Sequence, residues 1–340
     1  MSSSSSRALA INSNSPWRAL ASEGFRLYFF TQGVSVLGTW IQQIAIHWLV
    51  YRLSDSISLL GITAFATMAP QLIVGPIAGA WIDRHDARRL FIAVQALLVV
   101  HAALLAWLTW TALIDPALLV AMSVLLGVLA SFDIPLRQTL IGHLVTNARD
   151  LPSAMALNSM TFNAGRLLGP PLAGLVIAAS SEATCFIINA CSFIAPLVVV
   201  ARLRQQTPPA TSGPLRRLLA EGIQHALADF PVRTLVVMMA LVNLTASASI
   251  VLLPAFAKDV LAGDARTLGL LSGAAGLGAL IAMIDLARRT AMVHLVDATA
   301  SGAAISAGGL LLLGTSSSLW PALMALLLLG YGTSVANVAI

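Results

Sequence analysis

Long apolar stretches separated by short polar segments form the main pattern of this chain. Each stretch has about 20 residues or more, the length that an α-helix needs to cross the hydrocarbon core of a bilayer. The runs are continuous and lack the alternation of a membrane β-barrel strand, so they predict helices. The expected helices cover 25–50, 57–82, 90–114, 117–141, 155–178, 184–203, 233–256, 267–287, 295–315 and 320–340. The pattern therefore predicts an all-α integral membrane protein with about ten transmembrane helices.

The composition supports this class. Apolar residues make up 58% of the chain and charged residues only 10%, whereas a soluble domain carries about 25% charged residues. The net charge of +5 comes from Arg residues in short loops, which predicts contact with anionic lipid and not with nucleic acid. Cys185 and Cys191 lie in one apolar run at a spacing that suits neither a disulfide nor a metal site. We therefore expect no metal and no cofactor.

The Lys and Arg residues between the expected helices also predict the topology. Three of them fall on one side of the membrane: Arg52, Lys258 and Arg266. Thirteen fall on the other side: Arg7, Arg18, Arg26, Arg84, Arg88, Arg89, Arg149, Arg202, Arg204, Arg216, Arg217, Arg288 and Arg289. Because cytoplasmic loops carry the excess of positive charge, the N-terminus is expected in the cytoplasm. The chain is thus predicted to be a multi-pass protein of a bacterial inner membrane.

Four segments follow from the spacing of these helices. Residues 1–24 form a Ser-rich cytoplasmic tail, and residues 25–203 form a bundle of six helices. Residues 204–232 form a cytoplasmic linker with a short helix on the membrane surface, for which an ordinary solvated loop helix is the alternative. Residues 233–340 form a partial second bundle of four helices. Because the chain ends at Ile340 inside an apolar run, we expect two helices of the second bundle to be missing.

The loop between the second and third expected helices carries the first motif. Its candidate residues are Gly79, Asp83, Arg84, Arg88 and Arg89. Gly79 has no side chain and so allows close helix approach, while the Arg residues suit pairing with acids or lipid phosphates. The pattern of Gly, three residues, Asp-Arg and then two basic residues resembles the signature loop of the major facilitator superfamily. The family's usual Gly at the tight turn is Asp86 here, and a plain positively charged loop remains the alternative.

The fourth expected helix carries an acid and a base on one face. Asp133 and Arg137 are four residues apart, with Pro135 between them. Ionised groups at membrane depth are costly unless they are paired, so we expect these two to pair with each other or with Arg88. The resemblance implies that Asp133 joins the charges of the signature loop in a cytoplasmic gate. We expect a structural lock there and not a proton carrier.

The fifth expected helix carries a second motif, composed of Gly165, Arg166, Gly169, Pro170 and Gly174. The two first Gly residues form a packing face of small residues, and Pro170 is expected to kink the helix. The run resembles the antiporter motif of drug-exporting facilitators, with Ala156 and Ala173 in place of two of the family's Gly residues. It favours export over import, and a generic Gly/Pro kink is the alternative.

Further stretches, such as 38–51 and 132–138, resemble the branch of the enterobactin exporter and the transmembrane secretion effectors. This resemblance implies a major facilitator fold of two pseudo-symmetric six-helix bundles, with the second incomplete in this chain. It also implies a monomer that exports a small amphiphilic molecule, a drug or a siderophore, in exchange for protons. Proton coupling rests on the resemblance alone, because no acid lies midway in the first helix.

Polar residues within the expected helices are candidates for the substrate pathway: Gln43, His47, Asn158 and Asn163. His47 suits substrate or proton binding, and a role at the membrane interface is its alternative. The chain has no nucleophile–base pair and no phosphate-binding Gly-rich loop, so we expect neither an enzyme nor an ATP-driven pump. An uptake facilitator and an inactive truncated transporter remain as alternatives to the exporter.

Overall fold

The computed structural model describes residues 17–145, 147–202, 248–288 and 295–339, and every regular element in these ranges is helical. The first six long helices are α1 (Glu23–Ser54), α2 (Ile57–Ile82), α3 (Ala87–Trp110), α4 (Pro116–Leu144), α5 (Leu151–Ala179) and α6 (Glu182–Arg202). Residues 248–255 are helical and continue into a π-helical turn, η3 (Phe256–Val260). The chain then forms α9 (Ala265–Arg288), α10 (Leu295–Thr315) and α11 (Leu319–Ala339).

Each of the ten expected ranges contains a helix in the part that the structure describes, which confirms the all-α prediction. The expected helix 233–256 is described only from residue 248. The linker 204–232 with its surface helix, and residues 1–16 of the expected tail, lie outside the described residues. Two short 3₁₀ turns, η1 (Arg18–Ala21) and η2 (Ala148–Asp150), precede α1 and α5.

Short polar residues set the ends of several helices. The Asp115 carboxylate accepts a hydrogen bond from the Leu118 backbone N–H at 2.7 Å, and Pro116 occupies the first turn of α4, where its missing N–H costs nothing. Ser56 caps α2 in the same way. The third helix ends at Trp110 and not at the expected residue 114, because Ala112 adopts a left-handed conformation with φ of 56°.

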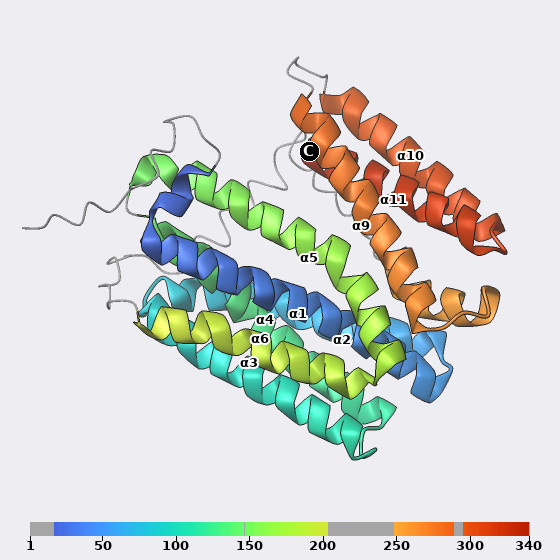
Figure 1. The fold of residues 1–340 in the computed structure, drawn as a ribbon, viewed down its shortest axis with the longest axis horizontal. Helices are drawn as coiled ribbons and strands as arrows, with labels where there is room; N and C mark the ends of the chain where they lie inside the picture. Colours follow the sequence, from blue (N-terminus) through green and yellow to red (C-terminus); the bar gives the residue numbers. More distant parts are fainter. Residues whose placement is uncertain (1–16, 146, 203–247, 289–294, 340) are drawn as a thin grey trace, which may run out of the picture.

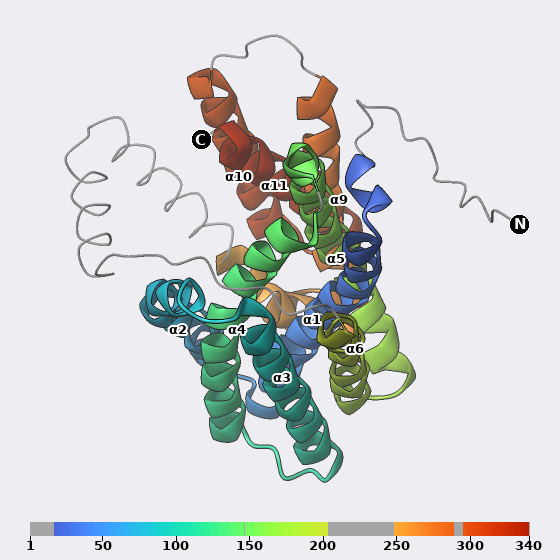
Figure 2. The ribbon, with the colours of Figure 1, turned by 90° about the vertical axis from the view of Figure 1, so that its left-hand side faces the viewer.

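The helices form two groups that meet along α5 and α9. In the first group α2 packs on α4, α3 on α6, and α1 on both α5 and α6. In the second group α11 packs on both α9 and α10. Figure 2 shows the two groups end-on, with α9–α11 above and α1–α4 with α6 below, and with α5 between them. In Figure 1, α5 and α9 lie together near residues 174 and 265 and diverge toward the other end.

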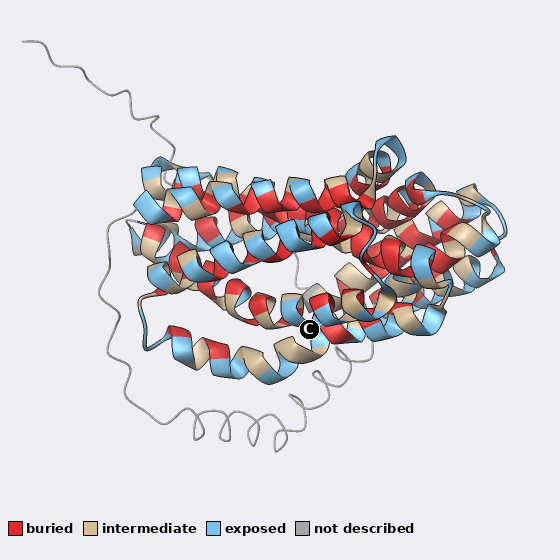
Figure 3. Ribbon diagram, turned by 90° about the horizontal axis from the view of Figure 1, so that it is seen from below, coloured by how far each residue is buried: buried red, intermediate tan, exposed pale blue. Residues whose placement is uncertain are grey.

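The surface of this assembly is apolar, as a bilayer requires. Leu72 and Phe65 on α2 are 81% and 71% exposed, which would be unfavourable in water. Buried residues follow the faces that the helices turn toward one another, and exposed residues follow the outside (Figure 3). Trp110 and Trp320 are exposed near helix ends, where aromatic side chains occupy the membrane interface.

Six of the described helices are long and apolar enough to cross a membrane, namely α2, α3, α4, α6, α9 and α11. By contrast, α1 and α5 have 32 and 29 residues but carry more polar side chains, such as the buried Gln42 of α1. These two helices pack on each other, and α5 also forms the boundary with α9. Their polar content therefore marks the interior of the assembly.

Candidate functional site

Contacts between helix ends define two ends of the molecule. At the signature-loop end, formed by residues 82–87, 144–150 and 200–202, Arg18 forms an ion pair with Asp150 at 2.5 Å. At the far end, formed by residues 51–57, 111–116, 179–182 and 256–265, Arg52 donates to the Glu182 carboxylate at 2.7 Å. Six helices, α1 to α6, thus connect the same two ends in alternating directions.

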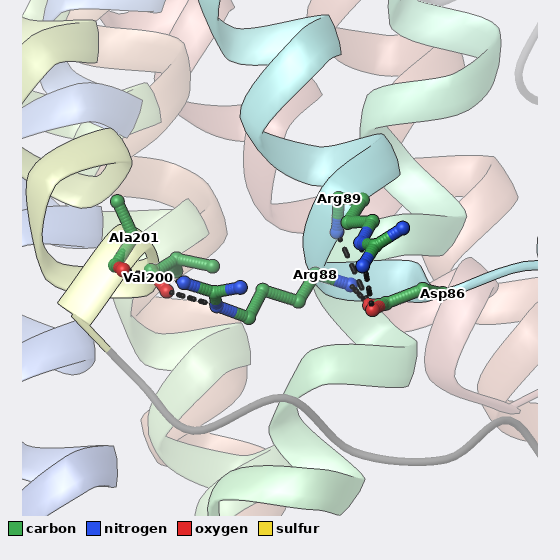
Figure 4. A network of polar contacts seen from close by, with 5 residues as sticks. All are labelled: Asp86, Arg88, Arg89, Val200 and Ala201. Atoms are coloured by element: carbon green, nitrogen blue, oxygen red, sulfur yellow. Dashed lines mark hydrogen bonds and ion pairs between the residues drawn. The ribbon is translucent and has the colours of Figure 1, made fainter.

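The signature loop joins α2 and α3 and contacts α6 (Figure 4). Asp86 accepts hydrogen bonds from the backbone N–H groups of Arg88 and Arg89 at 2.9 and 3.2 Å, and so caps α3. The Arg88 guanidinium donates to the carbonyl oxygens of Val200 and Ala201 at 3.1 and 2.5 Å. A cation at these last carbonyls of α6 is favoured by the helix dipole.

Asp86 therefore fits the turn where the resemblance leads one to expect Gly. Its φ of −66° is ordinary for any residue, so the turn needs no glycine here. Asp83 ends α2, and its backbone N–H donates to the Gly79 carbonyl at 3.1 Å. Both Asp83 and Arg84 are exposed.

The expected close helix approach at Gly79 is wrong for the described residues, because no atom of theirs lies within 4 Å of the position that a Cβ would take. Gly79 lies near the end of α2. The close approach to α2 occurs at Gly127 of α4, where a Cβ would meet the Thr67 carbonyl and would lie 3.1 Å from Pro70 Cγ.

Asp133 and Arg137 form the ion pair expected for the fourth helix. Arg137 Nε donates to one carboxylate oxygen at 2.5 Å, and Gln95 Nε2 of α3 donates to the other at 2.7 Å. The three side chains lie within the first group and are 8%, 4% and 0% exposed for Asp133, Arg137 and Gln95. Arg88, the other partner considered, bonds instead to α6. The cluster therefore ties α3 to α4 and is separate from the Arg88 contact.

The small residues of α5 pack on α1. A Cβ on Gly165 would lie 2.7 Å from Val36 Cγ1 and 2.8 Å from Trp40 Cδ1. A Cβ on Gly169 would also meet Trp40. The Trp40 ring thus occupies the space that the two missing side chains leave, and these Gly residues allow α1 and α5 to approach closely.

The opposite face of α5 packs on α9 through small residues of both helices. A Cβ on Gly269 would lie 2.7 Å from the Pro170 carbonyl oxygen, and one on Gly273 would lie 2.6 Å from Pro171 Cγ. A Cβ on Gly174 would lie 3.1 Å from Arg266 Cα. The motif residues of α5 therefore form the contact between the two groups, from the far end to the middle of the helix.

Arg166 crosses this boundary. Its guanidinium donates to the Ser334 hydroxyl of α11 at 3.3 Å. Gly276 of α9 would place a Cβ 2.9 Å from the Arg166 carbonyl oxygen. Arg166 is thus the motif residue whose side chain reaches the second group.

The four expected pathway residues lie on α1 and α5. Gln43 and His47 follow Trp40 by three and seven residues, on the face of α1 that Trp40 turns toward α5. His47 is buried and Gln43 half-buried. Asn158 and Asn163 are half-buried on α5, and Asn163 donates to the Ser159 carbonyl at 2.9 Å. No hydrogen bond joins any two of the four among the residues that the structure describes.

A polar cluster at the far end was not found from the sequence. The Tyr51 hydroxyl donates to the Asp259 carboxylate, and Lys258 pairs with Asp55. The Lys258 ammonium also lies 5.4 Å from the centre of the Tyr51 ring. These contacts join α1 to η3, across about 200 residues of sequence, and no spacing within either segment indicates the pairing.

Known proteins resemble this chain over most of its length. The family model of the transmembrane secretion effectors matches residues 14–339. The staphyloferrin A transporter of Staphylococcus aureus is 27% identical over 273 residues, which are 79% of this chain and 68% of that protein. The multidrug efflux pump Tap of Mycolicibacterium fortuitum is 26% identical over 207 residues, 60% of this chain and 50% of that protein. The chain thus spans from about half to two thirds of the length of these relatives.

Two solved structures share the fold. A bacterial homologue of the iron transporter ferroportin, in an inward-facing state, aligns with a TM-score of 0.70 at 15% identity, over 93% of this chain and 82% of that one. A bacterial homologue of the human lysosomal transporter Spinster, inward-facing and occupied, aligns with a TM-score of 0.71 at 12% identity, over 96% and 74%. The two likenesses show a shared fold. The family match over residues 14–339 shows that the chain belongs to the transmembrane secretion effectors of the major facilitator superfamily, which are membrane transporters and not enzymes.

Proposed function

We propose that this transporter exports a small amphiphilic molecule, of the drug or siderophore type, from the bacterial cytoplasm across the inner membrane in exchange for protons. The observation that carries the proposal is the asymmetry of contact between the two groups. At the far end they are held together by Gly174 against α9 and by the pairing of Lys258 with Asp55. Toward the signature-loop end α5 and α9 diverge (Figure 1).

In the proposed topology the signature-loop end faces the cytoplasm, because most of the Arg residues lie there. The divergence at that end then corresponds to a form open to the cytoplasm and closed to the outside. The Gly-lined boundary between α5 and α9 has the small side chains that allow two rigid groups to rock against each other. This boundary thus suits alternating access, with residues 25–203 and 233–340 as the two moving bundles.

The signature-loop and fourth-helix residues are proposed as the cytoplasmic gate: Gly79, Asp83, Arg84, Arg88, Arg89, Asp133 and Arg137. Of these, the buried pair of Asp133 with Arg137 acts as a structural lock on α3 and α4, since both carboxylate oxygens are already occupied. Gln43, His47, Asn158 and Asn163 line the proposed path beside α1 and α5. Export is supported by the resemblance of the α5 motif to that of antiporters and by the similarity to a multidrug efflux pump.

Efflux from energised cells tests this proposal. Cells that express the chain are loaded with rhodamine 123, and dye loss is followed before and after an uncoupler collapses the proton gradient. We expect faster loss than in empty-vector cells, abolished by the uncoupler and by Asp83→Asn. Faster accumulation of dye in place of loss would favour an uptake facilitator. Dye loss at the same rate with and without the uncoupler would contradict proton coupling.

A further inference from the structure

Arg166 is a charged residue in the middle of a long membrane helix. It is the sixteenth of the 29 residues of α5, so it lies about 22 Å from the start of the helix at 1.5 Å per residue. A lipid headgroup is out of reach at that depth. A charge at the centre of a bilayer is unfavourable unless a partner or water stabilises it, and such a residue marks a functional site.

Within the part of the chain that the structure describes, Arg166 uses little of its capacity for hydrogen bonds. A guanidinium has five N–H donors, and the described residues accept one hydrogen bond from it, at the Ser334 hydroxyl at 3.3 Å. No carboxylate of the described residues forms an ion pair with it, in contrast to Arg137, which is paired with Asp133 on α4. A buried charge without a counterion is costly, so the Arg166 guanidinium suits a ligand that carries a negative charge.

The surroundings of Arg166 belong to the boundary between the two helix groups. Its carbonyl oxygen lies against Gly276 of α9, and its side chain extends to α11. One turn before Ser334 on α11, the Tyr331 hydroxyl donates to the Asp285 carboxylate of α9 at 2.6 Å. This hydrogen bond joins α9 to α11 within the second group. The Arg166 guanidinium lies at the boundary between the two groups, which opens and closes in the proposed transport cycle.

We propose that Arg166 binds an anionic group, a carboxylate or a phosphate, of the transported molecule. The planar fork of a guanidinium matches both oxyanions with two parallel hydrogen bonds. Ser334 adds a hydroxyl from the second group, so that the anion is held between α5 and α11. This inference deepens the proposed function, on which it rests, by adding amphiphilic anions as a chemical class of cargo.

Binding to the full chain in lipid nanodiscs tests this site without any gradient. The probes are 5-carboxyfluorescein, an anion, and rhodamine 123, a cation with the same tricyclic core, each followed by fluorescence anisotropy. We expect Arg166→Gln to weaken carboxyfluorescein binding by about tenfold or more and to leave rhodamine 123 unaffected. Arg166→Lys keeps the charge but loses the planar fork, so its affinity for carboxyfluorescein should lie between those of the wild type and Arg166→Gln. Arg26→Gln, which removes an exposed charge at the start of α1, is the matched control and leaves both probes unchanged.

Competition with 1-naphthaleneacetate and 1-naphthyl phosphate distinguishes the two oxyanions, and 1-naphthaleneacetamide should not compete.

The proposal is overturned if the wild-type chain does not bind carboxyfluorescein or if Arg166→Gln binds it normally. It is also overturned if that variant weakens the binding of both dyes equally, as loss of a structural contact would. Separate results decide the export proposal and the anion site. Loss of binding in Arg166→Gln without any efflux from cells would retain the anion site and reject export, and efflux of rhodamine 123 without anion binding would do the reverse.

Discussion

Removal of the charge on Asp133 should destabilise the first helix group strongly. The carboxylate lies 2.5 Å from Arg137 Nε and 2.7 Å from Gln95 Nε2, with all three side chains buried. Asp133→Asn keeps the size of the side chain and an oxygen for Gln95, but leaves the Arg137 charge without its counterion. Breaking a buried ion pair on one side costs about 3–5 kcal/mol, so we expect the free energy of unfolding to fall by about 3 kcal/mol or more.

The double variant Asp133→Leu with Arg137→Leu tests whether the pair itself is responsible. Because it removes both charges, no unpaired charge remains. Its free energy of unfolding should therefore fall by much less than the sum of the decreases in the two single variants. The coupling energy should be about 2–3 kcal/mol. Equilibrium unfolding in mixed micelles with increasing SDS measures all variants.

A matched control lies on the same helix. Asp115 is exposed and caps the start of α4, and Asn caps a helix as well as Asp does. Asp115→Asn should therefore change the free energy of unfolding by less than about 0.5 kcal/mol. The reasoning is refuted if Asp133→Asn is equally harmless, or if the single-variant losses simply add in the double variant.

Three further predictions follow from close contacts. Gly165→Ala should lower the free energy of unfolding by about 1–3 kcal/mol by crowding α1, whereas Gly75→Ala, which meets nothing within 4 Å, should not lower it; equal effects of the two in SDS unfolding would refute the close packing. Asp86→Ala should lower the free energy of unfolding by about 1 kcal/mol, because it removes the cap of α3, and Asp86→Asn should change it little. A large decrease in Asp86→Asn would show that the charge of Asp86 matters and not its role as a cap. Tyr51→Phe with Lys258→Gln should raise the rate at which a membrane-impermeant thiol reagent labels a cysteine placed at the far end, and an unchanged rate would contradict a closing role for that cluster.

The sequence predicted the helices well because each is fixed by local properties. The range 57–82 agrees with α2 at both ends, since Ser56 caps it and polar residues follow it. The prediction was less accurate for helix ends that backbone geometry sets. Ala112 is an example, because no sequence pattern predicts its left-handed conformation. The contact of α4 with α2 through Gly127, and not through Gly79, also depends on which faces the helices turn to each other.

The candidate site divides in the same way. The pair of Asp133 with Arg137 was predictable because four residues on one helix form a neighbouring pair. The contact of Arg166 with Ser334 joins residues 168 apart, and the cluster of Tyr51 with Asp259 joins residues 208 apart. Such contacts are set by the docking of the two groups, which the sequence of either group alone does not encode.

Alternating access is the central claim, and paired distances measured by spin labels test it most directly. In a background with Cys185→Ser and Cys191→Ser, one label pair reports on the far end, Ile57→Cys with Arg266→Cys. The other reports on the signature-loop end, Met155→Cys with Ala300→Cys. On changing the pH or adding a bound probe, the account predicts that the far-end distance lengthens while the signature-loop distance shortens. Distances that stay fixed under every condition, or that lengthen together, would contradict it.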